Sequence, residues 1–302
     1  MKIKFHEFEG LGTQWKIYVA DKLSSGAKQD IYISSIETVR EFEDAFSRFK
    51  SSSWIGELNK RNRIDNPPEE LSDMLQFALE CATLTDNYFN IASGARLEDI
   101  GYDIDYSLKK KVSLRQVKNL EDVLSINSNS IETSKSASID LGGFGKGWLI
   151  DKLGKEITDR GIKSLVIDGG GDILVRGNVL GRTIPLEDPF SEGKIIGEVE
   201  LQNGAVASSS PKHRHWPDVQ GGIDLHHLVN PKSSDTITSI AAVYTHAGTA
   251  TSADTASTCL FVSPRSLHEQ IARHFGASYL VVLPDGSFYK STGYPGTVFT
   301  KS

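Results

Sequence analysis

Cysteine is scarce in this chain of 302 residues, and no long apolar run interrupts it. Cys81 and Cys259 are its two cysteines, and each stands in an apolar, helix-like context. Such usage argues against a disulfide framework or a cysteine-based metal site, and predicts two small core residues in a reducing compartment.

Segments that cross or anchor to a membrane are also missing. No run of about 18 apolar residues occurs, and the start, Met-Lys-Ile-Lys-Phe-His-Glu, shows neither an apolar signal region nor a lipid-anchoring cysteine. We therefore expect a soluble, cytoplasmic protein with no membrane anchor.

Positive charge is in deficit, with a formal net charge of −6. An acidic surface repels a phosphate backbone, and no cluster of Lys and Arg interleaved with aromatics offsets this, so the sequence argues against nucleic acid as a partner. An anionic ligand would have to meet a local positive charge or a metal ion.

The pattern along the chain is mixed α and β, and it predicts an α+β fold with a mostly antiparallel sheet and packed helices. Apolar spacing predicts a helix from a Ser35 cap to about Lys50, and another from Pro68 to about Asp86, with a polar loop over 50–67 between them. Further helices are expected at 145–160, 250–262 and 264–275, and strands at 3–8, 14–19, 164–168, 172–176, 181–186, 195–201, 238–245 and 279–283.

The most informative segment is 140–151, Asp-Leu-Gly-Gly-Phe-Gly-Lys-Gly-Trp-Leu-Ile-Asp, which leads from a short apolar strand into an amphipathic helix. Unpaired N–H groups at a helix N-terminus favour an anion. The segment is not a Walker loop, because Gly147 rather than Ser or Thr follows Lys146, and it does not fit GxGxxG. Spacing alone leaves a structural turn and an anion site equally open.

Two further clusters carry chemistry. The segment 168–172, Asp-Gly-Gly-Gly-Asp, has more glycines than a turn needs, which indicates either close backbone approach or a bulged hairpin. Asp254, Ser257 and Thr258 share a helix face and offer hard oxygen ligands suited to Mg²⁺. Asp254 could instead cap the helix while Thr258 bonds back to the backbone.

Histidines and serines lie between these clusters. In the strand-like pair His226 and His227, alternation should turn one imidazole toward a site and the other away. Together with His213 and His215 they suggest a possible zinc site, but no Cys or acidic ligand stands at suitable spacing. The run Ser208–Ser210 lacks the GxSxG elbow of a serine hydrolase.

Taken in order, these segments resemble the ApbE family of FAD:protein FMN transferases. The matching stretches are Leu11-Gly-Thr13, Phe46-Ser-Arg-Phe49, Glu57-Leu-Asn59, Tyr88-Phe-Asn90, Gly101-Tyr-Asp103, the glycine segment, the 168–172 turn, Ala205-Val-Ala-Ser-Ser209, His227-Leu-Val-Asn-Pro231 and Ala253–Thr258. The resemblance implies one ApbE-like (T-fold-like) globular unit over 1–302, with a helical subregion at about 35–110 packed on a core at about 120–302.

The resemblance also implies an activity and its residues. Such an enzyme cleaves FAD and attaches FMN to a Thr or Ser of an acceptor flavoprotein, and an FAD pyrophosphatase or an FAD-binding protein is the alternative. The family pattern places Mg²⁺ on Gly143, Asp254 and Thr258 with Ser257 adjoining, and gives Lys146, Asp254 and His227 catalytic roles, His227 as the base. The residues implied to bind FAD are Leu11, Phe49, Phe89, Asn90, Asp140, Lys146 and His227.

The chain departs from the family pattern at four positions. Asn230 and Asn90 stand where Asp is usual, Ser208 where Thr is usual, and Gly145 where Ala is common. None of these changes removes an implied metal ligand. Lost carboxylates at 90 and 230 could loosen nucleotide contacts or alter the choice of acceptor.

Overall fold

The computed structural model describes residues 5–179, 183–218, 222, 224–233 and 236–299. Its centre is an eight-stranded sheet in the order β1-β2-β6-β7-β10-β13-β14-β15, and every neighbouring pair is antiparallel. The strands are β1 (His6–Gly10), β2 (Thr13–Val19), β6 (Leu165–Gly169), β7 (Ile173–Arg176), β10 (Gly204–Ser209), β13 (Ala242–Ala247), β14 (Ser278–Val282) and β15 (Phe288–Lys290). The expected α+β class with an antiparallel sheet is confirmed.

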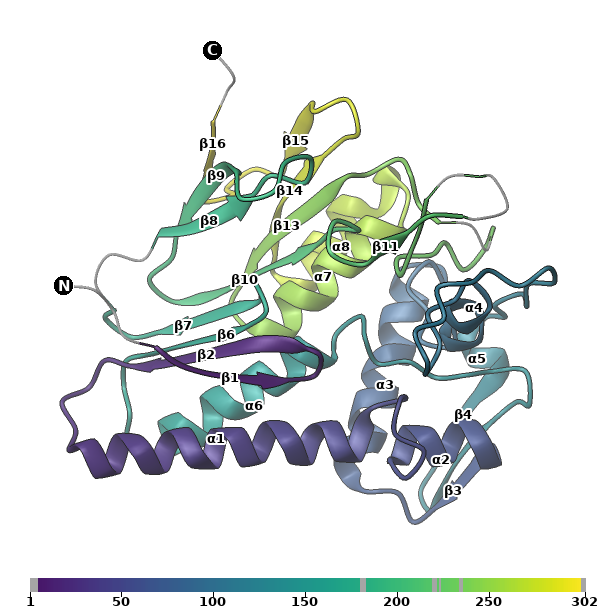
Figure 1. Ribbon diagram of the computed structural model, residues 1–302, viewed down its shortest axis with the longest axis horizontal. Helices are drawn as coiled ribbons and strands as arrows, with labels where there is room; N and C mark the ends of the chain where they lie inside the picture. The colour runs from purple at the N-terminus through teal and green to yellow at the C-terminus, as the bar shows by residue number, and fades with distance from the viewer. Residues whose placement is uncertain (1–4, 180–182, 219–221, 223, 234–235, 300–302) are drawn as a thin grey trace.

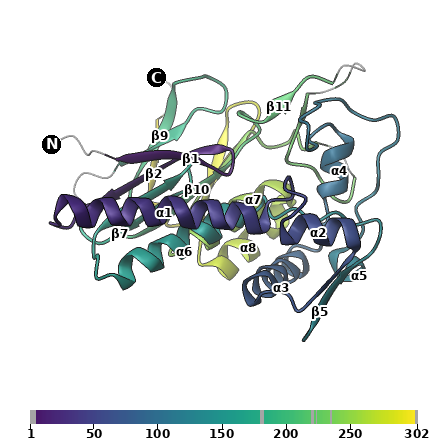
Figure 2. The same ribbon diagram turned by 60° about the horizontal axis from the view of Figure 1, so that its bottom comes forward.

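Both faces of this sheet are buried, because its side chains alternate between two cores. Leu165 and Ile167 face a layer of helices, whereas Val166 between them faces a second, small sheet. Figures 1 and 2 show the helices on one side and the small sheet on the other. The helices are α1 (Ser25–Phe46), α6 (Gly145–Asp159), α7 (Ala250–Val262) and α8 (His268–Phe275), and the small sheet is β16 (Gly296–Val298), β9 (Ile195–Glu200) and β8 (Thr183–Glu187).

A second group of elements flanks the end of α1 (Figure 1). It consists of α2 (Trp54–Arg61), β3 (Arg63–Asp65), α3 (Glu69–Leu84), α4 (Gly94–Asp99), α5 (Leu120–Val123), β4 (Leu124–Asn127) and β5 (Ser130–Thr133). The remaining elements are a two-stranded sheet of β11 (His215–Trp216) and β12 (Leu225–His226) and the 3-10 turn Arg265–Leu267. Within the described residues, no helix is long and apolar enough to cross a membrane. The expected division into a 35–110 subregion and a 120–302 core stays a prediction.

Two local predictions were wrong. Ser35 does not cap a helix: the cap of α1 is Ser24, eleven residues earlier, and the buried Ser35 hydroxyl donates to the Ile31 carbonyl at 2.8 Å. Packing of Ile31 extends the helix where the sequence shows no apolar stripe. The region 50–67 is not all loop, because a Ser53 cap opens α2 and β3 follows it.

Other predictions agree closely with the described elements. The helices expected from Pro68 and over 145–160 are α3 and α6. Strand β10 was not predicted as a strand, because its small residues show little alternation; they let α7 pack directly on it. The expected strand residues 3–4 and 181–182 lie outside the described ranges.

Candidate active site

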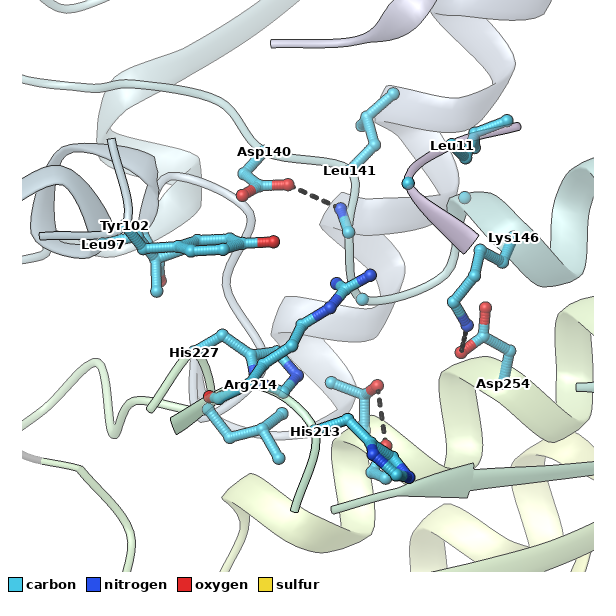
Figure 3. Close-up of a pocket in the computed structure, with 18 of the residues that line it drawn as sticks. Leu11, Leu97, Tyr102, Asp140, Leu141, Lys146, His213, Arg214, His227 and Asp254 are labelled. Carbon is cyan, nitrogen blue, oxygen red and sulfur yellow. Dashed lines mark hydrogen bonds and ion pairs between the residues drawn. The ribbon is translucent and has the colours of Figure 1, made fainter. Parts of the chain in front are cut away.

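A cavity of about 870 Å³ lies where the helices, the large sheet and the flanking group meet. It brings together nearly all the residues implied by the sequence, from segments far apart in the chain (Figure 3). Those that line it are Leu11, Phe49, Phe89, Asn90, Asp140, Gly143, Lys146, His227, Asp254 and Thr258. Ser257 is fully buried away from it, and its hydroxyl contacts the Ser209 hydroxyl at 2.7 Å and the Asp254 carbonyl at 2.9 Å.

Tight turns deliver two of these segments to the cavity. Leu11 and Gly12 form the two-residue turn between β1 and β2, with φ of 49° and 67°. In the 168–172 turn, Gly170 and Gly171 also have positive φ, and a Cβ on Gly170 would stand 2.2 Å from the Thr13 hydroxyl oxygen. The close backbone approach that the glycines of 168–172 suggested is therefore to the β1–β2 hairpin. The same turn places Asp172 beside the cavity.

The glycines of segment 140–151 have separate tasks. A Cβ on Gly143 would lie 2.8 Å from the Phe89 ring and 3.3 Å from the Thr258 methyl, so this residue sits directly between them. A Cβ on Gly147 would lie 2.4 Å from the Ala250 carbonyl oxygen, so Gly147 lets α6 pack against α7. Its N–H donates to the Asp254 carboxylate at 2.8 Å.

Two buried carboxylates share one half-buried ammonium group. Lys146 pairs with Asp172, and its Nζ lies 3.8 Å from Asp254 Oδ1. Burial alone would lower the pKa of Lys146, but these carboxylates outweigh it and raise the pKa. Burial, together with the charge of Asp172, raises the pKa of Asp254 despite Lys146. Two carboxyl groups thus stand against one ammonium group, and a further cation would stabilise the charged form of Asp254 that burial disfavours.

Oxygen donors for such a cation stand next to this cluster. The Asp254 carboxylate and Thr258 hydroxyl face the cavity one helical turn apart, and Gly143 contributes backbone beside Thr258. Over the described ranges, no group of three or more His, Cys, Asp or Glu side chains could hold a metal. A mixed set of carboxylate, hydroxyl and carbonyl oxygen fits Mg²⁺ better than Zn²⁺.

The opposite wall of the cavity is aromatic and held by an ion pair. Arg48 Nε lies 2.7 Å from Asp140 Oδ2, and Arg48 also donates to the Tyr102 carbonyl at 2.7 Å. The Arg48 guanidinium lies 4.1 Å from the centre of the Phe49 ring, and Tyr106 stacks on that ring at 5.3 Å. This wall offers flat apolar surface for an aromatic ligand.

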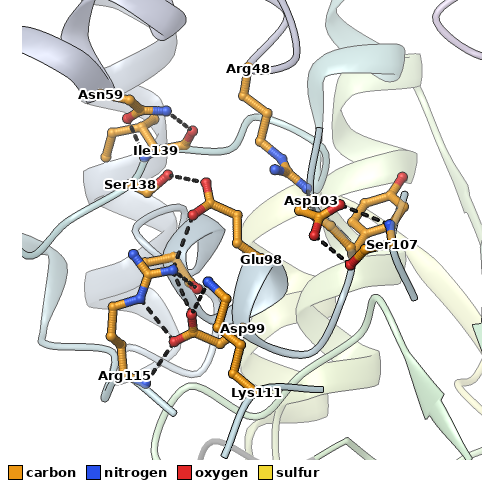
Figure 4. A network of polar contacts seen from close by, with 12 residues as sticks. Arg48, Asn59, Glu98, Asp99, Asp103, Ser107, Lys111, Arg115, Ser138 and Ile139 are labelled. Carbon is orange, nitrogen blue, oxygen red and sulfur yellow. Dashed lines mark hydrogen bonds and ion pairs between the residues drawn. The ribbon is translucent and has the colours of Figure 1, made fainter. Parts of the chain in front are cut away.

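An ion-pair network around the buried Asp99 carboxylate ties down the loop that carries Tyr102 and Tyr106 (Figure 4). Asp99 at the end of α4 accepts from the Arg115 guanidinium at 2.6 and 2.8 Å and from Lys111 at 3.1 Å. Burial alone would raise the pKa of Asp99, but these hydrogen bonds and charges lower it to about 2. The network thus joins the two ends of the loop 99–115.

The paired histidines behave as strand alternation predicts. His226 is buried, with its Nε2 bonded to the Ile237 carbonyl at 2.9 Å, whereas His227 lines the cavity. Burial and the charge of Arg214 lower the pKa of His227 to about 3, so its imidazole is neutral near pH 7. His213 pairs with Glu187, and the Ser209 hydroxyl bonds to Ser257 and Thr258.

Sequence reasoning gave no role to Arg48, Asp172, Tyr102 or Arg214. Arg48, Asp172 and Tyr102 lie inside the quoted segments 46–49, 168–172 and 101–103, so their positions were available but their partners were not. Arg214 lies between His213 and His215, a segment that the sequence suggested only as a possible zinc site.

Comparison with known proteins identifies the family of this chain. Residues 11–280 match the model of the ApbE family. Among curated proteins, an FAD:protein FMN transferase of Rhodobacter capsulatus is 26% identical over 72% of this chain and 43% of its own length. One of Klebsiella pneumoniae is 22% identical over 65% of this chain and 64% of its own length. The chain thus spans less than two thirds of either relative.

A solved structure extends the likeness to the whole fold. The ApbE protein of Thermotoga maritima superposes with a TM-score of 0.86 at 24% identity, over 97% of this chain and 98% of that one. The family match covers most of the sequence, including both the glycine segment and the Asp254–Thr258 helix face. This chain is a member of the ApbE family.

Proposed function

We propose that this chain is an FAD:protein FMN transferase. It cleaves the pyrophosphate of FAD, attaches FMN through a phosphoester to a Thr or Ser hydroxyl of an acceptor flavoprotein, and releases AMP. One observation carries the proposal: a single large cavity joins an aromatic wall to a buried cluster of Asp172, Lys146 and Asp254 with oxygen donors beside it. The names of the curated relatives support it.

The oxygen donors suit a Mg²⁺ ion, held by the Asp254 carboxylate, the Thr258 hydroxyl and the Gly143 carbonyl. When bound, such an ion supplies positive charge to the pyrophosphate, which is the main requirement of phosphoryl transfer. Lys146 and the Gly147 N–H hold Asp254 in place for this task. Ser257 supports the same helix from within the core rather than from the cavity.

The reaction forms one bond and breaks one. The acceptor hydroxyl oxygen attacks the phosphorus on the FMN side, the bond from that phosphorus to the bridging oxygen breaks, and AMP leaves with the electron pair. His227 takes the hydroxyl proton, although burial and the charge of Arg214 make its imidazole a weak base. Its Nδ1 lies 3.4 Å from the Arg214 carbonyl, which favours the tautomer with the proton on Nδ1 and leaves Nε2 as a proton acceptor.

The test is to incubate the protein with FAD, Mg²⁺ and an acceptor flavoprotein domain that an ApbE relative modifies. We expect flavin fluorescence on the acceptor band of a denaturing gel and one AMP released per adduct. An established transferase serves as the positive control for the acceptor. Free FMN and AMP without adduct would instead indicate an FAD pyrophosphatase, and unchanged FAD a binding protein; either result would refute the proposal.

A further inference from the structure

The basic side chains of the cavity differ in whether their charge is already paired. Five lysine and arginine side chains line the cavity, and four of them have a carboxylate within reach. Arg48 pairs with Asp140, Lys50 with Asp44, Lys146 with Asp172 and Asp254, and Lys212 with Glu187. Arg214 is the exception: among the described residues, its guanidinium has no carboxylate within ion-pair distance and no hydrogen-bond acceptor.

The backbone around Arg214 is held firmly, so its side chain has a fixed origin. Its N–H donates to the Pro211 carbonyl at 2.9 Å. Two residues before it, the Lys212 ammonium donates to Glu187 and to the carbonyls of Asp188 and Ser191 at 2.7 to 3.0 Å. Two residues after it, the buried Trp216 indole donates to the Ile100 carbonyl at 2.9 Å.

From this anchored turn the side chain extends into the cavity. Figure 3 shows Arg214 reaching into the space between Tyr102, His227 and the Lys146–Asp254 pair. Its charge influences the pKa of all four of these groups, in keeping with that central place. Arg214 is half-buried, so its charged side chain stays partly exposed to solvent and meets no large desolvation cost.

Charge balance identifies what such a group would bind. Five acidic side chains, Glu43, Asp140, Asp172, Glu187 and Asp254, line the cavity and equal the basic ones in number. Every one of these carboxylates already faces a lysine, an arginine or a backbone N–H. The unpaired Arg214 guanidinium can therefore bind an anion from outside the chain. A planar guanidinium binds two oxygens of a phosphate at once, with charge-assisted hydrogen bonds.

We propose that Arg214 is a catalytic residue that binds the pyrophosphate oxygens of FAD and stabilises the negative charge passing to the leaving AMP. This inference rests on the proposed function and adds a specificity: the site selects flavin that carries a diphosphate over flavin without one. Lys146, whose charge is taken by two carboxylates, positions Asp254, while Arg214 supplies the free positive charge. Attack on phosphorus leaves one more negative charge on AMP, which is the charge that the guanidinium offsets.

The test compares Arg214→Met and Arg214→Lys with the parent protein and with Arg160→Met, the same change at an exposed position on the far end of α6. Dissociation constants for FAD and for riboflavin are measured by flavin fluorescence, and transfer to the acceptor is timed. Riboflavin carries the ring but no phosphate, so it reports on the aromatic wall alone.

We expect Arg214→Met to weaken FAD binding about 10- to 100-fold, the range for a charged hydrogen bond, with riboflavin binding unchanged. The turnover rate should fall about 10²- to 10³-fold, as when a donor to developing charge is removed. Arg214→Lys should recover part of both losses, and Arg160→Met should match the parent. If Arg214→Met keeps the parent's ratio of FAD to riboflavin affinity, the inference is wrong.

The two hypotheses can fail separately. If the parent protein gives no adduct on any acceptor, the proposed transferase function fails. The ratio of FAD to riboflavin affinity still decides whether Arg214 binds the diphosphate. If the parent transfers FMN and Arg214→Met does so at the same rate, Arg214 is not catalytic even though the function stands.

Discussion

Gly147 is the point at which a single methyl group should separate the two helices that build the site. A Cβ there would lie 2.4 Å from the Ala250 carbonyl oxygen and 2.8 Å from Asp254 Cβ. The carbonyl oxygen is part of the backbone, so it cannot swing aside, and α6 and α7 must move apart by roughly 1 Å to reach normal contact distances. Overpacking of this kind costs about 1–3 kcal/mol, of which the better helix propensity of Ala returns about 1 kcal/mol.

We therefore expect Gly147→Ala to lower the melting temperature by a few degrees, at roughly 2–4 °C per kcal/mol. Because the shift also moves the Asp254 carboxylate, turnover of FAD should fall about 10²-fold. Thermal melting and AMP release measure the two effects.

Gly145→Ala is the matched control for stability. It introduces the same methyl group two residues earlier in the same helix, where the nearest heavy atom is Leu141 Cβ at 3.7 Å, an ordinary contact. Its melting temperature should equal or slightly exceed that of the parent. If Gly147→Ala has the same melting temperature as Gly145→Ala and also turns over FAD at the parent rate, close packing at Gly147 does not position Asp254.

Two further changes probe the site from other directions. Arg115→Met should destabilise the protein by about 1–3 kcal/mol at pH 7 and raise the dissociation constant for FAD, because it frees the loop beside Asp99. Since the pKa of Asp99 is about 2 in the folded protein and about 3.9 when unfolded, the stabilisation is present above pH 4 and fades toward pH 2. Urea unfolding should therefore show the unfolding free energies of parent and variant converging below pH 4. A difference between them that is as large below pH 4 as at pH 7 would contradict the role of the network. Thr258→Val should raise the Mg²⁺ concentration for half-maximal turnover at least ~10-fold, whereas Ser257→Ala should chiefly lower stability, by about 1–2 kcal/mol, because it leaves the Ser209 hydroxyl short of a partner. Magnesium titration and melting separate these outcomes, and a reversed pattern would exchange the roles of the two residues.

Periodicity explains why much of the site could be predicted. Asp254 and Thr258 are four residues apart, so a helix places both on one side, and the cavity indeed has both on its wall. Ser257 belongs to the same broad face, but one residue turns the helix by about 100°, which is enough to direct its hydroxyl toward β10. Spacing alone does not show which of two neighbouring residues faces the ligand.

Charge pairing is a tertiary property, and that is where prediction from sequence stopped. The resemblance implied that Lys146 binds FAD, yet its ammonium group lies between Asp172 and Asp254, which stand 26 and 108 residues away in the chain. Conversely, nothing local distinguishes Arg214 from the paired Arg48; only the positions of carboxylates from other elements do. The same limit applies to α1, whose first turns depend on packing rather than on apolar spacing.

The central claim is that Asp254 holds the metal needed for transfer of FMN from FAD to an acceptor. Its most direct test is in-gel flavin fluorescence of the acceptor, compared for the parent, Asp254→Asn, and the exposed control Asp159→Asn, each with Mg²⁺ and with EDTA. We predict adduct from the parent and from Asp159→Asn only when Mg²⁺ is present, and a loss of at least about 100-fold in Asp254→Asn, which keeps an acceptor for the Gly147 N–H but loses the charge. Adduct formed by Asp254→Asn at the parent rate, or adduct from the parent that persists in EDTA, would contradict the account.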